Sequence, residues 1–339
     1  MNSRRVTTSG ALLVPLLMVA IAGTLTLGAC GGTSTTSTPP GTPSVAVITS
    51  GATPLPTTSV TGTIAFTRVT KTHGKDSGDI YAIRSDGTGL RRLAASRKDE
   101  RQAAWSPDGS RIAYLRYLHP WIMDANGSRQ RSVTVERGGY WKVAWSPDGA
   151  RIALVRLAGN LAIVDADGGG LRNLTKSRSY PVVWNPVWAP DGRILFTSRM
   201  SGDSSQICAI DPDGSGVTVI VAPSGADPDL AFSLSPDGKW LAFWDSGSDR
   251  LVRRPADGRG TEVVLVDNVT QYFAPPIHDR ELGIASSWSP DGTAVAFAAD
   301  ESPPGGSRPS ALYIVNADGS GLRKVPNTGR VFNPAWRPR

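Results

Sequence analysis

A short turn motif recurs at near-regular intervals along most of this chain. Its complete form, Trp-Ser-Pro-Asp-Gly, occupies residues 105–109. Four further copies begin at Trp145, Trp188, Leu234 and Trp288, and a truncated copy begins at Trp336. The aspartates of the five longer copies are 40, 43, 46 and 54 residues apart. A unit of this length cannot bury its own apolar face, so neighbouring copies are expected to stack against one another.

Strand-like runs surround each turn. A β-type run such as Ile112–Tyr114 follows the first turn, and a second run such as Ile80–Ile83 leads into another Gly turn, here Asp86-Gly87. A basic and apolar run such as Leu90–Leu93 ends the unit. With the Trp segment, each unit has four strands. We therefore expect an all-β fold, a six-bladed β-propeller of four-stranded antiparallel blades over residues 61–339.

The turn residues have a local physical role. Pro fixes φ at the first central position of the turn, Asp accepts hydrogen bonds from nearby amides, and Gly takes the positive φ that leads into the next strand. The segments 165–168 and 211–214 look like fragments of a calcium loop, but neither has the glutamate expected six residues after its Gly. We expect no metal and no cofactor.

The repeats resemble those of the TolB-type, WD-repeat-like β-propeller family over roughly residues 61–339. The resemblance implies the six-bladed fold and, as partners, a peptidoglycan-associated lipoprotein and an energised inner-membrane system. In the family's namesake a small α/β domain precedes the propeller, whereas a Ser/Thr/Pro-rich segment precedes it here. We therefore expect a TolB-like propeller on a bacterial lipoprotein rather than TolB itself.

The order of the strands predicts how the ring closes. The first unit begins with Ile64–Phe66, a second strand, while the chain ends on a Trp strand, Phe332–Trp336. We expect the C-terminal strand to join the first blade beside Thr63–Arg68, which removes an exposed sheet edge. The five repeat tryptophans are expected in the core between blades.

Residues 1–29 are expected to be an export signal. Arg4 and Arg5 precede the apolar run Ala11–Leu27, and Leu-Gly-Ala leads directly into Cys30. This junction resembles the bacterial lipobox, which implies a diacylglyceryl group on the Cys30 thiol and cleavage before it. The alternative is an ordinary signal peptide with a chance cysteine. The twin-arginine route is a second possibility, although Val6 and the residues after it lack the usual apolar pattern.

Residues 30–60 are expected to be the lipidated Cys30 and a disordered tether of Ser, Thr, Pro and Gly. The protein would then be lipid-anchored at the extracytoplasmic face of the bacterial cell membrane. The net charge of +7 falls by two without Arg4 and Arg5, and the remaining charges of both signs are interspersed. We therefore expect no nucleic-acid partner, and a monomer.

The connectors between blades are expected to share one end of the ring, since successive turns of an antiparallel sheet lie at alternate ends. Variable loops on a rigid scaffold commonly bind partners, and Trp, Tyr and Arg are enriched at interface hot spots. Some of these side chains are expected only to cover the ends of the blades. The candidate binding residues are Tyr140, Trp141, Arg178, Tyr180, Trp184, Tyr272, Phe273, Arg280, Arg330 and Phe332.

The sequence contains no recognisable catalytic motif. His73, His119 and His278 are expected in connectors as solvated loop residues, and Cys208 as a buried thiol. We therefore predict a binding or scaffold propeller, without catalysis, that recognises an envelope protein or a cell-wall or exported polymer. The alternative is a carbohydrate-active (lyase- or hydrolase-like) or peptidase-related enzyme with a site at the channel mouth. A third interpretation is a structural or sensory surface protein.

Overall fold

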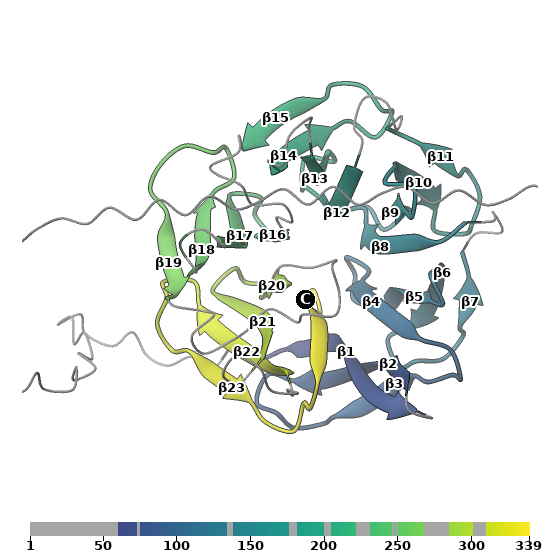
Figure 1. The fold of residues 1–339 in the computed structure, drawn as a ribbon, viewed down its shortest axis with the longest axis vertical. Helices are drawn as coiled ribbons and strands as arrows, with labels where there is room; N and C mark the ends of the chain where they lie inside the picture. The colour runs from purple at the N-terminus through teal and green to yellow at the C-terminus, as the bar shows by residue number, and fades with distance from the viewer. Residues whose placement is uncertain are drawn as a thin grey trace, which may run out of the picture. The chain divides into compact units, whose positions relative to one another are not determined.

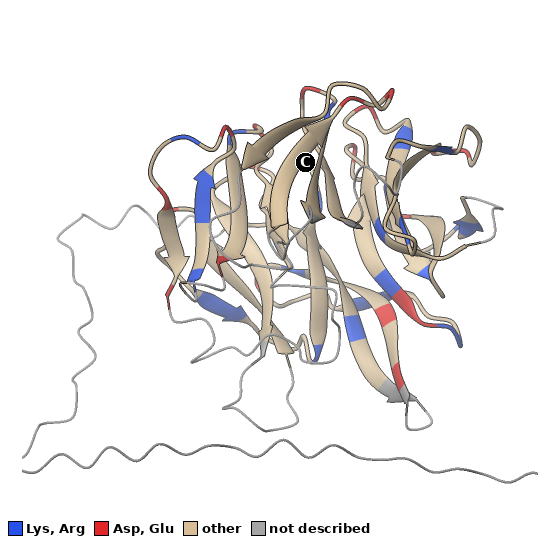
Figure 2. Cartoon of the chain, turned by 45° about the horizontal axis from the view of Figure 1, so that its top comes forward, with Lys and Arg blue, Asp and Glu red and all other residues tan. Residues whose placement is uncertain are grey.

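Every regular element that the structure describes is a β-strand. The computed structural model describes residues 60–72, 75–133, 138–175, 182–199, 205–221, 231–245, 248, 250–267, 285–300 and 310–339. Their strands form six four-stranded antiparallel sheets, arranged as blades around a common centre (Figure 1). The predicted six-bladed propeller is confirmed. In Figure 2 basic and acidic residues are interspersed across the blades.

The first half of the ring contains blades 1 to 3, each named here from its innermost strand outward. Blade 1 consists of β24 (Val331–Trp336), β1 (Thr63–Thr72), β2 (Lys75–Arg84) and β3 (Arg91–Ala94). Blade 2 consists of β4 (Glu100–Trp105), β5 (Arg111–Arg116), β6 (His119–Asp124) and β7 (Arg131–Ser132). Blade 3 consists of β8 (Tyr140–Trp145), β9 (Arg151–Arg156), β10 (Leu161–Asp165) and β11 (Arg172–Asn173).

The second half contains blades 4 to 6. Blade 4 consists of β12 (Val182–Trp188), β13 (Ile194–Arg199), β14 (Ser205–Ile210) and β15 (Thr218–Val221). Blade 5 consists of β16 (Phe232–Leu234), β17 (Trp240–Asp245), β18 (Arg250–Pro255) and β19 (Val263–Val266). Blade 6 consists of β20 (Ser286–Trp288), β21 (Ala294–Asp300), β22 (Ser310–Asn316) and β23 (Arg323–Val325).

The ring closes through the C-terminal strand, as the strand order predicts. β24 pairs antiparallel with β1, so that Trp336 lies opposite Ile64 and Phe332 opposite Thr67. Beyond the strand, the Arg337 amide donates to the Thr63 carbonyl at 2.8 Å. The first and last segments of the ring therefore form one sheet, and β1 has neighbours on both sides.

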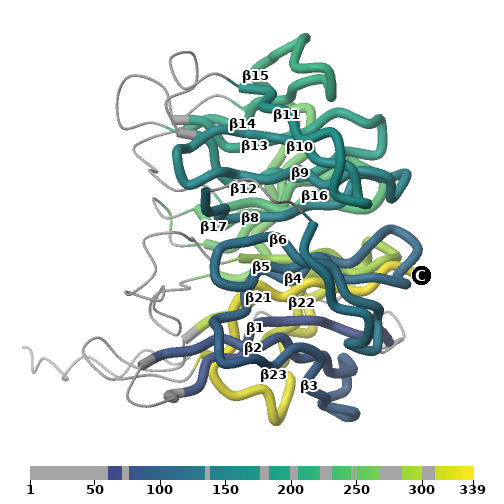
Figure 3. The backbone as a smooth tube through the Cα atoms, turned by 90° about the vertical axis from the view of Figure 1, so that its right-hand side faces the viewer, coloured from purple at the N-terminus to yellow at the C-terminus, as the bar shows by residue number. Residues whose placement is uncertain are grey.

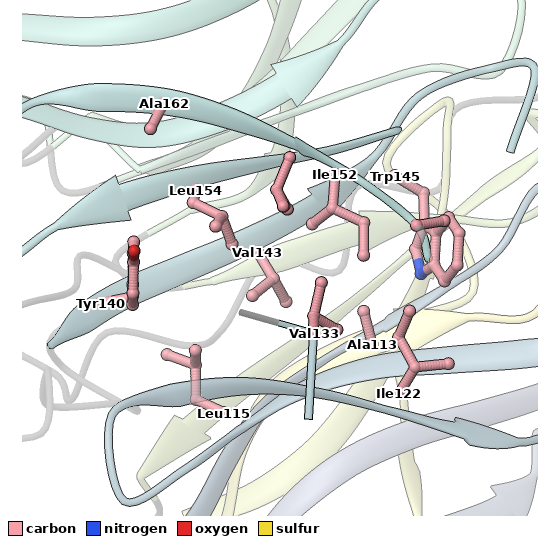
Figure 4. Packing of buried hydrophobic residues seen from close by; sticks show 12 residues of the cluster. Ala113, Leu115, Ile122, Val133, Tyr140, Val143, Trp145, Ile152, Leu154 and Ala162 are labelled. Atoms are coloured by element: carbon pink, nitrogen blue, oxygen red, sulfur yellow. The ribbon is translucent and has the colours of Figure 1, made fainter. Parts of the chain in front are cut away.

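The core lies between the blades. Buried apolar side chains form six clusters, one at each blade boundary of the described ring. Figure 4 shows the cluster between blades 2 and 3, in which Trp145 of blade 3 packs with Ala113 and Ile122 of blade 2. Each blade therefore completes the core of the next, and a single blade has no core of its own.

The repeat tryptophans occupy equivalent places in these clusters. Each is no more than 8% exposed: Trp105, Trp145, Trp188, Trp288 and Trp336. The indole N–H of three of them donates to a carbonyl on the inner strand of the preceding blade. These bonds join Trp105 to Ala335 at 3.1 Å, Trp145 to Ala104 at 3.1 Å and Trp288 to Ser233 at 3.4 Å. The predicted role of the tryptophans in the inter-blade core is confirmed.

The Ser-Pro-Asp-Gly turns are held by one short network. The Ser106 hydroxyl donates to the Asp108 carboxylate at 2.6 Å and accepts from the Arg111 amide at 2.9 Å. Asp108 also accepts from the Ser110 amide at 3.0 Å, and Gly109 has a φ of 63°. The same serine-to-aspartate bond recurs in the turns at Ser146, Ser235 and Ser289. Asp in the motif is therefore a turn residue.

The two ends of the ring differ in their connections. Within each blade, the turn after the inner strand and the turn before the outer strand lie at the same end of the ring. Hydrogen bonds between these turns show this: the Ala125 amide donates to the Ser110 carbonyl, and the Ala166 amide to the Ala150 carbonyl, each at 2.8 Å. We call this the turn end; the side view places the C-terminus there (Figure 3). The opposite end, where the inner strands begin, we call the loop end.

Two single-residue expectations have different outcomes. Cys208 is fully buried on β14, which confirms the expected buried thiol, and burial raises the pKa of this thiol to about 11. His119 was expected in a connector, but it is the first residue of β6 and pairs with Arg116. The β5–β6 turn is shorter than expected because two residues suffice to reverse the chain.

Removal of residues 330–339 should sharply destabilise the propeller, because β1 then loses its inner partner and Trp336 leaves the core. Loss of one buried Trp costs about 3–5 kcal/mol, which corresponds to a fall in melting temperature on the order of 10 °C. Thermal melting followed by circular dichroism measures this. Removal of Arg339 alone is the control, and an unchanged melting temperature in the longer truncation would contradict the closure.

Replacement of Asp108 by Asn should reduce stability in a pH-dependent way. The pKa of the Asp108 carboxyl is lowered to about 2, chiefly by the hydrogen bond from Ser106, against about 3.9 in an unfolded chain. The carboxylate therefore stabilises the fold fully above about pH 4, and this contribution is lost as the pH falls towards 2. The gap in melting temperature between wild type and Asp108→Asn should narrow over that range. A gap that stays constant from pH 7 to pH 2 would rule this out.

Candidate functional site

The described candidate binding residues lie in inner strands rather than in connectors. Tyr140 and Trp141 begin β8, Trp184 lies in β12, and Phe332 lies in β24. Only Arg330, which directly precedes β24, lies outside a strand. The inner strands extend further towards the loop end than the turn pattern predicts, since their pairing continues past a β-bulge in blades 2, 3 and 4.

These residues differ in how much of the side chain is exposed and so available to a partner. Tyr140 is fully buried in the core between blades 2 and 3, and Phe332 is 9% exposed. Trp141 and Trp184 are partly buried. The Arg330 guanidinium binds Asp76 at 2.8 Å and lies 5.6 Å from the centre of the Phe332 ring. Arg330 and Phe332 are thus brought together, while Tyr140 has a packing role.

Several predicted residues lie outside the described ranges. They are Cys30, His73, Arg178, Tyr180, Tyr272, Phe273, His278 and Arg280. Across the described ranges, no group of three or more His, Cys, Asp or Glu side chains is placed to hold a metal ion. In the same residues, no helix has the length and apolar character needed to cross a membrane.

Three exposed apolar side chains gather at the loop end of blades 2 and 3. Tyr117 and Leu118 form the tip of the β5–β6 hairpin and are 66% and 38% exposed, and Leu157, in the corresponding turn of blade 3, is 43% exposed. A Cβ at Gly139 would lie 2.3 Å from Leu157 Cδ1 and 3.2 Å from Leu118 Cβ, so both leucines pack over this glycine. We call Tyr117, Leu118 and Leu157 the hairpin patch.

The tip of this hairpin is strained. Tyr117 and Leu118 have φ angles of 49° and 65°, a region that bulky residues rarely adopt. Two-residue hairpin turns of this kind normally use Asn-Gly. Such positions cost about 1–3 kcal/mol each and cluster at functional sites. Leu118 packs over Gly139, but Tyr117 is 66% exposed, so this strained pair is a candidate for a role in recognition.

Backbone contacts fix the hairpin against the ring. The Tyr117 amide donates to the Asp99 carbonyl at 2.8 Å, and the Leu118 carbonyl accepts from the Tyr140 amide at 2.8 Å. Asp99 directly precedes the inner strand of blade 2, and Tyr140 begins that of blade 3. The tip is therefore tied to both inner strands, and the hairpin patch is presented on a rigid support.

A buried ion pair lies beneath the hairpin. Glu100 is fully buried and accepts from Arg116 Nε at 2.8 Å, and the Arg116 guanidinium lies 4.2 Å from the centre of the Trp121 ring. Burial raises the pKa of Glu100, while the charge of Arg116 opposes that shift. Arg116 also donates to Gln130. These contacts hold the base of the β5–β6 hairpin in one position.

The sequence analysis did not single out the hairpin patch. One sequence feature could have pointed to it. Two strand-like runs meet between Arg116 and His119, yet the residues between them include no Gly, Asn or Asp, which a tight turn normally uses. Without such residues, the alternation of apolar and polar residues does not locate the turn unless the ends of the two strands are already known. As a site, this arrangement offers a rigid, exposed apolar surface and no reactive group, so it is suited to recognition.

Comparison with known proteins agrees with this architecture. The TolB beta propeller domain family matches residues 58–339. TolB from Acinetobacter baumannii is similar in structure, with a TM-score of 0.63 at 23% identity, over 82% of this chain and 67% of that one. A putative TolB from Agrobacterium tumefaciens gives a TM-score of 0.58 at 16% identity, over 82% and 99% of the two chains.

A third solved structure shares the fold as well. A chain of the nidogen–laminin complex gives a TM-score of 0.59 at 12% identity, over 81% of this chain and 98% of that one. No curated protein sequence matches this chain. At such identities, likeness to a solved structure shows the fold and leaves the partner open.

Proposed function

This chain belongs to the TolB β-propeller family, and from that premise we propose that it is a non-catalytic, lipid-anchored binding propeller of the bacterial envelope. It recognises an envelope protein or a cell-wall or exported polymer at the extracytoplasmic face of the membrane. The loop end of the ring makes the contact. The fold serves as a rigid support that positions this end.

The hairpin patch is the observation that carries this proposal. A Tyr and two Leu side chains are exposed at the loop end, and the Tyr and one Leu form a turn with a strained backbone. Exposed apolar groups on a rigid support are typical of protein interfaces, and Tyr is enriched among hot-spot residues. Aliphatic side chains favour a protein partner over a polysaccharide, so an envelope protein is the first choice.

Anchoring through Cys30 completes the proposal. The segment of residues 30–60 is rich in Ser, Thr, Pro and Gly, and a flexible chain of this length has a root-mean-square reach of ~30 Å. The ring could then sample partners near the membrane while its attachment remains fixed. The two acyl groups implied by the lipobox would give a firm anchor, since each buried methylene contributes about 0.8 kcal/mol.

The double substitution Tyr117→Asn with Leu118→Gly should separate recognition from folding. It replaces the strained pair with the residues that such turns prefer, so the melting temperature should stay constant or rise. Capture of the partner by crosslinking in intact cells, followed by mass spectrometry, should fall at least about tenfold. Leu322→Ser is the control, because Leu322 is 46% exposed outside the hairpin patch and should leave capture unchanged. Equal capture by wild type and the double variant would refute the role of the patch.

Substitution of Cys30 by Ser should release the protein from the membrane. The variant is expected in the soluble extracytoplasmic fraction, and the wild type in the membrane fraction with a lipid-modified N-terminal Cys30 by mass spectrometry. Cys208→Ala is the matched control, since it removes the other cysteine and should leave the protein membrane-bound. Membrane retention of Cys30→Ser would overturn the anchor without affecting the proposed recognition at the loop end.

A further inference from the structure

The repeat pattern departs furthest from its usual residues at the boundary between blades 4 and 5. Five inner strands carry the buried Trp, but blade 5 has Leu234 in that place. The outer strands of four blades carry an Arg that reaches the next blade, but blade 4 has Thr218 and blade 5 has Val263 at this position. Leu234 and Thr218 face the same boundary, which therefore lacks both the Trp and the outer Arg. The residues lost are the ones that fill and cover the corresponding space elsewhere in the ring.

The boundary between blades 2 and 3 shows the complete arrangement. Trp145 packs among the residues labelled in Figure 4, and its indole N–H donates to the Ala104 carbonyl at 3.1 Å. The guanidinium of Arg111, from blade 2, lies 4.7 Å from the centre of the Trp145 ring. The next boundary repeats the stacking, with Arg151 of blade 3 at 5.3 Å from Trp188. A cation of one blade thus covers the indole of the next.

An outer Arg closes the same boundaries from the rim. The side chain of Arg131 donates to the Ala166 carbonyl at 2.6 Å, and that of Arg172 donates to the Pro212 carbonyl at 2.8 Å. Equivalent bonds join Arg91 to Ala125 at 3.4 Å and Arg323 to Ser85 at 2.7 Å. At the boundary between blades 4 and 5, the equivalent acceptor position is Ala256 of blade 5. The equivalent donor position is Thr218 of blade 4, whose side chain is too short to reach across.

A cavity of about 480 Å³ lies at the turn end of the boundary between blades 4 and 5. Leu234 lines it at the Trp position, Arg193 at the position of the covering cation, and Ala256 at the position of the outer acceptor. Leu195 and Val219 supply apolar wall, and Val219 is 54% exposed. The cavity therefore coincides with the place where the other boundaries hold a Trp ring. Its volume is in the range of small-molecule and side-chain pockets.

The cavity wall has no large excess of charge. Arg193 binds its neighbour Asp191 at 2.9 Å, and Asp237 accepts from Ser235 at 2.6 Å. The cavity also contains Asp257 and Arg259, one of each sign. A charged ligand would gain little here, whereas an aromatic ring would bury apolar surface and face the Arg193 guanidinium. The chemistry of the wall matches that of the filled boundaries.

A second depression at the turn end makes a useful contrast. It has a volume of about 550 Å³ and is lined by Arg111, Arg129 and Arg131. Each of these is already engaged: Arg111 with Trp145, Arg129 with Asp124, and Arg131 with the Ala166 carbonyl. Here the repeat residues are present and their partners are satisfied. Of these two depressions, the one between blades 4 and 5 is the one that lacks the residues that fill the equivalent space elsewhere in the described ring.

We propose that the cavity between blades 4 and 5 binds an aromatic side chain, in particular the indole of a Trp on a partner protein. The partner's ring occupies the space that the other boundaries give to their own Trp. The indole must come from another protein, because the ten Trp residues of this chain all lie in the strands of the ring. This site is at the turn end and is independent of the recognition proposed at the loop end.

Binding of 5-fluoroindole to the full-length protein, followed by ¹⁹F NMR, tests the proposal. We expect saturable binding, and stronger competition from N-acetyl-tryptophanamide than from N-acetyl-leucinamide. Leu234→Trp fills the cavity from within and should weaken binding at least tenfold. Leu322→Trp is the matched control, since it adds the same ring at an exposed position outside the cavity and should bind like wild type.

Thr218→Arg provides a second variant that does not depend on repacking the core. Thr218 is exposed, so the substitution leaves the fold intact, and the new side chain can reach Ala256 as its counterparts reach theirs. It should close the rim of the cavity and also weaken 5-fluoroindole binding at least tenfold. The proposal is overturned by the absence of saturable binding to wild type, by equal competition from the two amides, or by unchanged binding in Thr218→Arg.

Discussion

The ring depends on the packing of each blade against its neighbour, which in five of the six blades includes a buried Trp of the inner strand. No sheet here has a core of its own, because each cluster of buried side chains belongs to two blades. The indole fills this shared space, and at three boundaries it also donates to a carbonyl of the preceding inner strand, as Trp105 does to Ala335. Because each blade shares its buried side chains with two neighbours, the last strand must return to the first blade to complete the ring.

Because the blades depend on one another for their core, positions that differ from the repeat pattern can be compared directly with their equivalents in the other blades. At most boundaries a loss of packing would only weaken the ring. Between blades 4 and 5, the changes at Leu234 and Thr218 leave a cavity that opens at the turn end. At the loop end, the exposed Tyr117 and Leu118 replace residues that would relieve strain. Both candidate sites therefore lie where the chain departs from what the fold alone would favour.

Much of the fold could be predicted from the sequence because its signals are local. The Ser-Pro-Asp-Gly turns carry their own hydrogen bonds, as Ser106 and Asp108 show, and the spacing of these turns gives the number of blades. The candidate site was less predictable. Tyr140 has the residue type of a binding residue but is fully buried, since blade 2 packs over it. Exposure depends on the neighbouring blade, which the local sequence does not specify.

The sequence by itself determined the six-bladed ring, its closure by Phe332–Trp336 and the place of each Trp between blades. These features follow from turn chemistry and from the need of each repeat to bury an apolar face. Only the tertiary structure decided which side chains are available. It buried Tyr140, exposed Leu118 beside Leu157 from the next blade, and left a cavity beside Leu234. The exposure of a side chain depends on how two neighbouring blades pack, and the sequence of a single repeat does not specify that packing.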